Sequence, residues 1–333
     1  MSLDAVAKRA GVSTATVSRV LNKFGAVKTS TRTRVLKAIE ELNYHPNLNA
    51  RNLAGGRNQT IGMIASNLEN PFFFDIFKSL EAQALARGYE VVVANTDYRT
   101  GHLASSVRLM IGRRVAGLAL IVSEMDADLL DDLAHSKTPV VLYDVGTPGP
   151  NVASIRVNYG RSIQKIVEYL YNGGHRKMSF VGHHAALGPT GAREKAFTEA
   201  TSKYGDQLET RIATDNDALE GGRQAARQLL SDGFKPTAIV CVNDFMATGV
   251  LRELRDRGLR VPEDVSVTGY DNIKLSEFCS PPLTTVHIPR DRIGQIAFEC
   301  LVPEHGRASA VGREIVIDPE FLIRDSTGPA RKP

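Results

Sequence analysis

The sequence predicts a multidomain protein, with a small all-α head at the N-terminus and a larger α/β core behind it. Three observations favour this fold class. The chain has 333 residues, more than one hydrophobic core usually spans. Its first 45 residues carry apolar side chains at helical spacing only. From residue 60 onward, short apolar strands alternate with amphipathic helices.

The composition is that of a soluble globular chain, with 42% hydrophobic and 23% charged residues and no Trp. No apolar run reaches the roughly 18 residues that a membrane span needs, and no export signal opens the chain. We therefore expect a cytoplasmic protein that binds no membrane. The three cysteines, Cys241, Cys279 and Cys300, lack metal-ligand spacing. We expect no metal site and no cofactor.

Charge is unevenly distributed along the chain. Residues 1 to 58 hold ten Lys and Arg against three acidic residues, a net charge of +7. Because the whole chain carries +4, the remaining residues carry −3. A basic head suits a polyanionic partner, whose phosphates supply affinity independent of sequence. Charge alone also fits a solvated surface.

The stretch "SLDAVAKRAGVSTATVSRVLN" predicts two short helices joined by a tight turn. Gly11 interrupts the apolar spacing of the first helix, and Ser13 can cap the second. Two helices that cross steeply need a small residue at the crossing, a turn residue that tolerates positive φ, and a branched apolar residue behind the second helix. Ala7, Gly11 and Val17 meet these needs in order.

A third helix is predicted from Thr29 to about Leu42, with Val35, Leu36, Ile39 and Leu42 on its buried face. The second helix would then present short polar groups and one long cation to a DNA major groove. These residues are Thr14, Ala15, Thr16, Ser18 and Arg19. Together with the basic charge, this pattern favours DNA binding over an ordinary three-helix bundle.

The segment "YHPNLNARNLAGGRNQTIGMI" carries a family resemblance. "LNARNLA" supplies barely two helical turns, too few to hold a helix alone in water. With "DAVAKRAGVSTATVSRVLN" before it, the chain resembles the lactose-repressor (LacI/GalR) family of bacterial transcription regulators from residue 3 to about 325. The resemblance implies a hinge helix that pairs with its dimer mate in the minor groove, with Asn47, Ala50 and Leu53 as DNA contacts and Leu53 as an apolar wedge.

In the core, the candidate strands are "TIGMIA", "YEVVVAN", "AGLALIV", "PVVLYD", "KMSFVG", "TAIVCVN" and "VSVTGYD". Apolar strands separated by helices predict parallel sheets covered on both faces. The resemblance implies a periplasmic-binding-protein-like core of two Rossmann-like subdomains with three crossovers. We expect a helix-turn-helix domain at 1–45, a hinge helix and linker at 46–58, a core at 59–325 and a flexible tail at 326–333. Within the core we expect an N-subdomain of 59–157 and 289–316, and a C-subdomain of 158–288 and 317–325.

Ligands of such sheets sit at the carboxyl ends of the strands, so residues that end strands are the candidates. Two more features fit a sugar: Arg193 opens the helix after "MSFVG", and Phe72 and Phe73 offer flat apolar surface to a sugar ring. The resemblance matches these positions to ligand contacts. The candidate effector-binding residues are Phe72, Phe73, Ser123, Asp144, Arg193, Asn243, Asp244 and Asp271.

The chain departs from the family pattern in two places. Some relatives stack the ligand on an aromatic residue in the segment that matches "TDNDALEGG", where this chain has only Asp217 or its neighbours. Leu187 and Pro189 replace polar residues of purine-responsive relatives, which disfavours a purine. An acid sugar or phosphosugar stays open, with Arg193, His183 or His184 as its cationic contact.

The resemblance thus implies a dimeric, sequence-specific DNA-binding repressor that recognises a palindromic operator and responds to a sugar or sugar acid. A regulator that responds to another metabolite remains an alternative. A sugar-converting enzyme with a DNA-binding head, such as a kinase, is a second alternative. It would need a phosphate cradle or a general base, and the sequence offers no catalytic constellation. The chain ends soon after "EFLIRDS" without apolar heptads, which favours a homodimer over a tetramer.

Overall fold

The computed structural model describes residues 2–21, 25, 27–44, 58–184, 188–303 and 312–331. They belong to two compact units, residues 1–58 and residues 59–333. The first unit is the head and the second is the core, and each is described by itself.

The head contains three helices, α1 (Leu3–Ala10), α2 (Thr14–Leu21) and α3 (Thr29–Glu41). Ser2 caps α1 by accepting the Ala5 N–H, and Ser13 Oγ accepts the Thr16 N–H at the start of α2. Gly11 ends α1 with φ of 64° and donates its N–H to the carbonyls of Ala7 and Lys8. The predicted turn between the first two helices is confirmed, because only a residue tolerant of positive φ closes α1 in this way.

A small apolar core joins these three helices. It consists of Val6, Ala7, Ala10, Val17, Val20, Val35 and Ala38. The prediction for Leu36 was wrong: its side chain is 51% exposed, whereas Ala38 is buried. Helical spacing fixes which residues share a face, but here the buried face of α3 is centred on Val35 and Ala38.

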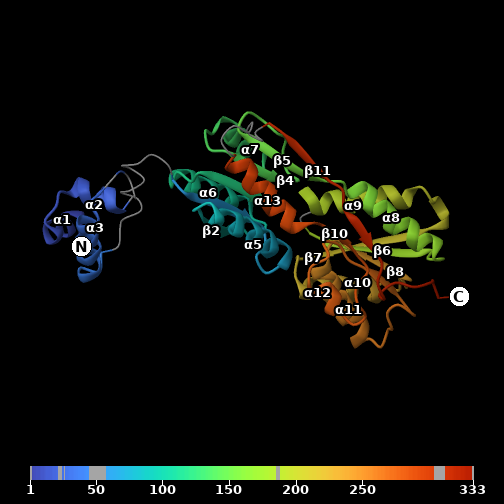
Figure 1. The fold of residues 1–333 in the computed structure, drawn as a ribbon. Helices are drawn as coiled ribbons and strands as arrows, with labels where there is room; N and C mark the ends of the chain where they lie inside the picture. Colours follow the sequence, from blue (N-terminus) through green and yellow to red (C-terminus); the bar gives the residue numbers. More distant parts are fainter. Residues whose placement is uncertain are drawn as a thin grey trace. The chain divides into compact units, whose positions relative to one another are not determined.

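The core unit begins with a six-stranded, all-parallel sheet of order β11-β5-β4-β3-β1-β2 (Figure 1). Its strands are β1 (Thr60–Ala65), β2 (Glu90–Asn95), β3 (Gly117–Ile121), β4 (Val140–Tyr143), β5 (Val152–Val157) and β11 (Glu314–Ile317). Its helices are α5 (Pro71–Ala86), α6 (Thr100–Gly112), α7 (Ala127–His135) and α13 (Arg290–Leu301). We call this part the N-subdomain.

Alternation along the strands divides the N-subdomain into two apolar layers. In β1, Ile61 and Met63 pack on the face covered by α5, while Ile64 faces Leu103 of α6 in a separate cluster. A Cβ at Gly62 would lie 2.9 Å from Leu118, so the tight packing on the second face requires a glycine. Both faces of the sheet are therefore buried, as expected of a parallel sheet.

The second sheet has four parallel strands in the order β7-β6-β8-β9 and forms the C-subdomain. The strands are β6 (Lys177–His183), β7 (Glu209–Asp215), β8 (Ala238–Cys241) and β9 (Ser266–Thr268). Its helices are α8 (Tyr159–Asn172), α9 (Gly188–Ser202), the 3₁₀ turn η1 (Gly205–Gln207), α10 (Leu219–Ser231), α11 (Asp244–Asp256) and α12 (Leu275–Phe278). The all-α head and the α/β core that the sequence predicts are thus confirmed.

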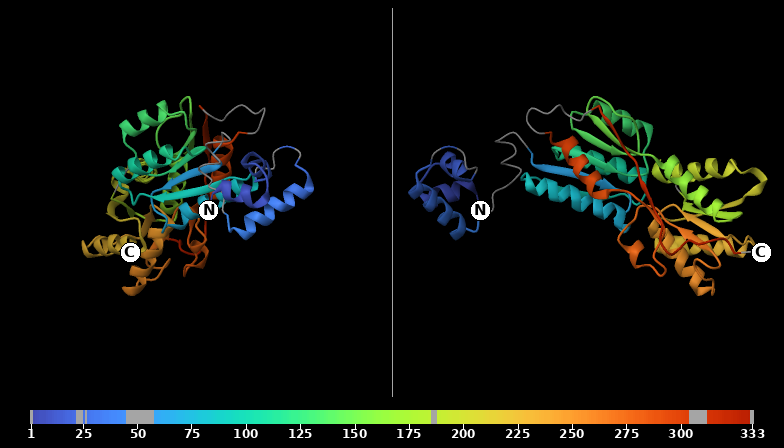
Figure 2. Two further views of the ribbon diagram at one scale, coloured as in Figure 1. Left: turned by 90° about the vertical axis from the view of Figure 1, so that its left-hand side faces the viewer. Right: turned by 45° about the vertical axis from the view of Figure 1, so that its right-hand side comes forward.

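The chain passes between the two sheets three times. The passages lie between β5 and α8, between β10 (Thr285–His287) and α13, and between β11 and β12 (Glu320–Leu322). Through the second passage α13 comes to lie next to α5, more than 200 residues away in the sequence (Figures 1 and 2). After the third, β12 pairs antiparallel with β10. These passages hold the two subdomains against each other.

The C-terminal segment is ordered, so the prediction of a flexible tail at 326–333 was wrong for residues 326–331. Ser326 is fully buried, and its carbonyl accepts the Val267 N–H while its hydroxyl donates to the Val267 carbonyl. Further along, Ala330 donates its N–H to the Gly173 carbonyl. The polar composition looked like a solvated tail, but the Ser326 groups pair with the edge of β9.

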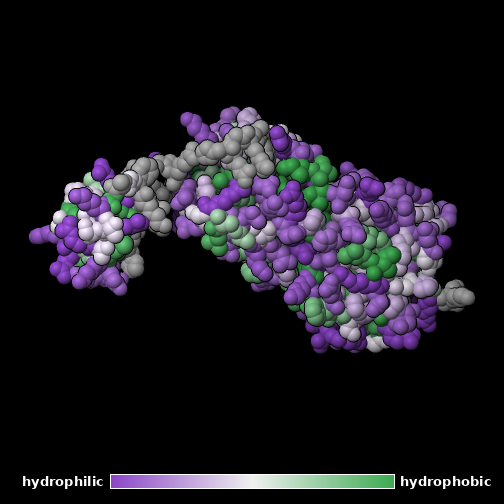
Figure 3. Space-filling view, viewed as in Figure 1, coloured by the Kyte–Doolittle hydropathy of each residue, from purple (hydrophilic) through white to green (hydrophobic). Residues whose placement is uncertain are grey.

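On the face seen in Figure 3 the surface is mainly hydrophilic, with exposed apolar side chains gathered in small separate patches. Across the described ranges, no helix is both long and apolar enough to span a membrane.

Candidate ligand cleft and DNA-binding head

A small cleft lies between the two subdomains. The N-subdomain supplies what we call the N-wall: Asn70, Phe72, Phe73, Tyr98, Val122, Ser123 and Tyr143. The C-subdomain supplies the C-wall: Pro189, Thr190, Arg193, Asp217, Asn243 and Asp271. The sequence-predicted residues Phe72, Phe73, Ser123, Arg193, Asn243 and Asp271 therefore lie together in one cavity.

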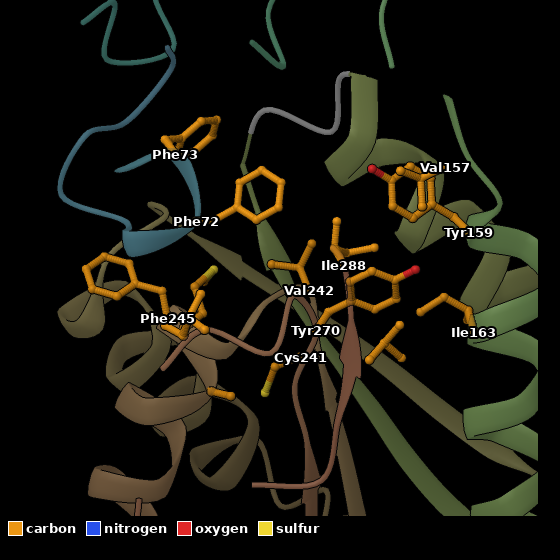
Figure 4. Packing of buried hydrophobic residues seen from close by; sticks show 14 of the residues in the cluster. Phe72, Phe73, Val157, Tyr159, Ile163, Cys241, Val242, Phe245, Tyr270 and Ile288 are labelled. Carbon is orange, nitrogen blue, oxygen red and sulfur yellow. The ribbon is translucent and has the colours of Figure 1, made fainter. Parts of the chain in front are cut away.

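The start of α5 shapes the N-wall. Asn70 caps this helix, since its Oδ1 accepts the Phe72 N–H at 3.1 Å. The rings of Phe72 and Phe73 meet edge to face, with centroids 5.3 Å apart. In Figure 4 the rings of Phe72 and Tyr270 lie on either side of Val242 and Ile288. The N-wall thus offers two buried aromatic rings set at right angles to each other.

A buried carboxylate ties together the strand ends below the N-wall. Glu124 accepts hydrogen bonds from the hydroxyls of Ser66 and Thr96, which follow β1 and β2. Ser66 Oγ in turn accepts the Ser123 N–H at 2.9 Å. Glu124 is 1% exposed, so this carboxylate lies in the interior of the protein.

The C-wall contains a buried ion pair. Arg193 Nη2 lies 3.0 Å from Asp271 Oδ1, and both side chains are at most 5% exposed. Arg193 Nη1 donates to the Val242 carbonyl at 2.7 Å, and its guanidinium lies over the rings of Tyr159 and Tyr270. Arg193 Nε, also buried, has no hydrogen-bond partner among the described residues. A ligand oxygen could satisfy this donor.

Burial disfavours the charged form of Asp271 and raises its pKa to about 6, although Arg193 and Arg290 act in the opposite direction. Burial and a neighbouring opposite charge are expected to oppose each other in this way where an ion pair is removed from water.

Asp217 forms the centre of the C-wall. Its carboxylate accepts hydrogen bonds from Asn243 Nδ2 at 2.7 Å, from Asn70 Nδ2 at 3.2 Å and from the Tyr98 hydroxyl. Asn67 Nδ2 donates to the backbone carbonyl of Asp217 at 2.8 Å. Asn67, Asn70 and Tyr98 belong to the N-subdomain, so Asp217 joins the two sides of the cleft.

The head presents a different kind of surface. Val17 and Val20 of α2 are buried, and Ala15 and Arg19 on the same helix are exposed. Thr14, Thr16 and Ser18 are partly exposed. The predicted contacts Asn47, Ala50 and Leu53 lie outside the described residues.

Comparison with known proteins places both parts of the chain. The family described as "Bacterial regulatory proteins, lacI family" matches residues 2–47, and the family described as "Periplasmic binding protein-like domain" matches residues 167–327. The HTH-type transcriptional repressor PurR of Photobacterium profundum is 36% identical over 96% of this chain and 97% of its own length. The chain belongs to the lacI family.

Solved lacI-family structures share the fold. The lac repressor dimer bound to operator and the anti-inducer ONPF is similar at 29% identity, with a TM-score of 0.83 over 98% of this chain and 99% of that one. The transcriptional regulator CelR in complex with cellobiose is 27% identical, with a TM-score of 0.71 and the same coverage of both chains. This lacI-family protein is a DNA-binding transcriptional repressor with an effector-binding core, not an enzyme.

Two predicted residues, Asp144 and Asp244, do not line the cleft of this lacI-family repressor. Asp144 accepts the Val157 N–H at 2.8 Å and the Tyr159 hydroxyl at 2.6 Å. Asp244 accepts the Ile273 N–H at 2.8 Å and the Thr285 hydroxyl at 2.5 Å. Both strand-end carboxylates turn away from the cavity and satisfy nearby donors. Burial raises the pKa of Asp144 to about 6, and that of Asp244 well above its ordinary value.

Other lining residues escaped the sequence prediction as candidates, among them Asn70, Tyr98, Asp217 and Thr190. Asn70 had a usable signal, because an Asn directly before Pro71 often caps a helix. Tyr98 had no such signal, because it is a loop residue with φ of 59°. In the parts of the chain that the structure describes, no group of His, Cys, Asp and Glu could hold a metal ion.

Proposed function

We propose that this lacI-family repressor binds a palindromic operator as a homodimer, and that a small carbohydrate in the cleft controls its affinity for the operator. The observation that carries the proposal is the composition of the two walls. Fixed donors and acceptors on the C-wall face the aromatic rings of Phe72 and Phe73 on the N-wall. Such walls suit a ligand whose hydroxyls lie around its rim and whose C–H groups form a face.

The polar groups of the C-wall match vicinal hydroxyls in particular. A hydroxyl both donates and accepts, so it can donate to a carboxylate such as Asp271 and accept from Arg193 or Asn243. Charge-assisted bonds of this kind stabilise the complex by roughly 1.5 to 3 kcal/mol each. The structural similarity to a regulator in complex with cellobiose supports the same class of ligand.

A purine base is the second candidate effector, and relatives that carry the name PurR keep it in the test. Two features of the cleft argue against it. Pro189 lines the C-wall and offers no hydrogen-bonding side chain, and Asp217 offers a carboxylate rather than an aromatic ring for stacking.

Dimerisation is supported by an apolar groove on the outer face of the C-subdomain. Its lining includes Leu219, Leu275 and Phe278, and the Phe278 ring is 73% exposed. A second copy of the chain would cover these side chains, and a lac repressor dimer is among the similar structures. We expect Phe278→Asp to shift the protein toward monomer in sedimentation experiments, whereas Ile212→Asp, on the exposed strand β7, should leave the dimer intact.

Operator contacts are proposed for Thr14, Ala15, Thr16, Ser18 and Arg19 of α2, and for Asn47, Ala50 and Leu53 in the hinge. The head's net charge of +7 supports phosphate contacts around them. A ligand that binds one arrangement of the subdomains better than another changes how the two heads of a dimer meet the DNA. Because the partner is a chromosomal operator, we propose that the protein acts in the cytoplasm.

The test has two steps. First, the full chain is screened by thermal shift against sugars, sugar acids and purine bases, and an operator is selected from random duplexes. Second, the selected operator is titrated with wild-type protein and with Arg193→Ala, with and without the ligand found in the screen. We expect Arg193→Ala to bind the operator normally but to lose its response to the ligand.

Arg161→Ala serves as the matched control, since Arg161 is an exposed arginine of the same subdomain. An Arg193→Ala variant that responds at the wild-type ligand concentration would refute the assignment of the cleft. Stabilisation by purine bases alone would refute a carbohydrate effector.

A further inference from the structure

Asp217 differs from Arg193 and Asp271, the other charged side chains of the cleft, because all of its hydrogen-bond partners are neutral. Its carboxylate is 5% exposed and is held by two amides and a phenol, those of Asn70, Asn243 and Tyr98. Within the described part of the chain, no Lys or Arg side chain forms an ion pair with it. A buried carboxylate without a cation is costly unless a partner supplies the charge.

Arg193, the arginine that lines the cleft, is already part of an ion pair. Arg193 lies 3.0 Å from Asp271, so its charge is matched on the same wall. Of the charged groups that line the cleft, two are carboxylates and one is a guanidinium. Asp217 therefore leaves the lining with an excess negative charge.

Two further observations describe the surroundings of Asp217, while Arg290 lies on the far side of Asp271, donating to the Asp271 carbonyl. Glu124 adds a further buried carboxylate behind the N-wall, held by hydroxyl groups. Burial raises the pKa of Tyr98 well above its ordinary value, and Asp217, Glu124 and Asp271 raise it further. Three carboxyl groups thus act on the Tyr98 hydroxyl.

An independent feature of the same cavity points to an oxygen on the ligand. Arg193 lines the cleft, and its Nε atom is buried and has no hydrogen-bond partner among the described residues. The cleft therefore offers one unused donor and one carboxylate without a counter-charge. A ligand that satisfies both carries an acceptor oxygen and a positively charged donor.

We propose that Asp217 binds a protonated amino group of the effector, so that the cleft selects an amino sugar over neutral and acidic sugars. The inference rests on the proposed carbohydrate effector. A ring or hydroxyl oxygen accepts from Arg193 Nε, the ammonium donates to Asp217, and the apolar ring face packs on Phe72 and Phe73. An acidic sugar would bring its carboxylate toward Asp217 and Asp271, while Arg193 is already paired.

The experiment measures direct binding to the full chain by calorimetry. The probes are glucosamine, galactosamine and mannosamine, each compared with its N-acetyl derivative, its neutral hexose and its uronic acid. We expect one amino sugar to bind at least about tenfold more tightly than its three counterparts, because a hydrogen bond between two charged groups is stronger than one between neutral groups.

Asp217→Asn removes the charge and keeps the shape of the side chain, so the preference for the amino sugar should vanish in this variant. Asp215→Asn makes the same change two residues away and outside the lining, and should keep the preference. Between about pH 7 and about pH 9, wild-type affinity for the amino sugar should fall as its amine loses a proton, while affinity for neutral sugars should stay constant. This pH arm tests the proposal even if Asp217→Asn folds poorly.

The outcomes separate this proposal from the one on which it rests. Equal binding of neutral or acidic sugars, or an unchanged preference in Asp217→Asn, overturns the role of Asp217 and leaves a carbohydrate effector standing. If no sugar of the panel binds and hypoxanthine does, both proposals fail.

Discussion

The two walls of the cleft are held in different ways. On the C-wall, the pairs Arg193–Asp271 and Asn243–Asp217 form within one subdomain. On the N-wall, the polar side chains of Asn70 and Tyr98 reach across the cleft to Asp217. The first set of contacts survives if the subdomains move apart, and the second set breaks.

This difference suggests that the two walls have different roles. A wall whose charged groups are fixed by their own subdomain is preorganised for recognition, and costs little to order when a ligand binds. A wall that makes its polar contacts only in the closed arrangement responds to closure. Ligand choice should therefore depend mainly on the C-wall, and coupling to the rest of the molecule on the contacts that cross the cleft.

The largest expected effect comes from breaking the C-wall ion pair. Asp271→Ala leaves the Arg193 guanidinium buried without its carboxylate, which should lower the free energy of unfolding by about 3 to 5 kcal/mol. Urea unfolding measures this loss. Glu314→Gln is the control, because its pair with Arg156 is about half exposed and should contribute at most about 1 kcal/mol. A loss below about 1 kcal/mol for Asp271→Ala would mean that the C-wall is not preorganised by this pair.

A smaller effect is expected for Asn243, which also acts within the C-subdomain. Its Oδ1 caps α11 by accepting the Met246 N–H at 2.8 Å, and its Nδ2 donates to Asp217. Asn243→Ala should therefore cost about 1 to 2 kcal/mol in urea unfolding. Asn243→Ser keeps a capping oxygen and should recover part of that loss; equal stabilities of the two variants would contradict the capping role.

The pH dependence of the free energy of unfolding should show the contribution of the Asp144 carboxyl. Burial raises its pKa to about 6, so the folded state holds the proton more tightly than the unfolded state does. Its contribution to stability is complete below about pH 4 and is lost as pH rises through about 6. From about pH 7.5 to about pH 5, this carboxyl should add about 1 kcal/mol to the free energy of unfolding.

Comparing wild type with Asp144→Asn by urea unfolding across this range isolates that contribution, since the other carboxyl groups are common to both proteins. Parallel pH profiles would show that the Asp144 carboxyl titrates as it does in the unfolded chain.

The smallest change in stability is expected for the N-wall. Tyr98→Phe removes one donor to Asp217 that bridges the subdomains, and should lower the free energy of unfolding by less than about 1 kcal/mol. It should nevertheless speed amide hydrogen exchange several-fold around Asn67 and Asp217, because the closed arrangement loses a contact. Tyr89→Phe, in the same subdomain but outside the lining, should leave this exchange unchanged. No change in Tyr98→Phe would mean that its hydroxyl does not hold the cleft closed.

Sequence pattern predicted the fold best where one element carries its own signal. The strand "TIGMIA" coincides with β1, and the turn at Gly11 has the expected positive φ. The strands β7 and β11 lacked such a signal, because β7 buries only Ala213 and β11 exists through its pairing with β5, over 150 residues earlier. The ordered segment after Ser326 was missed for the same reason, since its partners lie in β9 and near Gly173.

In the cleft, the sequence by itself determined which residues end the parallel strands, because alternation and length mark an apolar strand and its end. It could not determine where those side chains point. Asp144 and Asp271 both end strands with positive φ, 54° and 98°, yet one turns to the Val157 N–H and the other to Arg193. Only the tertiary structure decided between these directions, because each carboxylate turns to the donors that distant segments bring close to it. For the same reason Asp217, Asn70 and Tyr98, which are remote in the chain, became neighbours only when the two subdomains met.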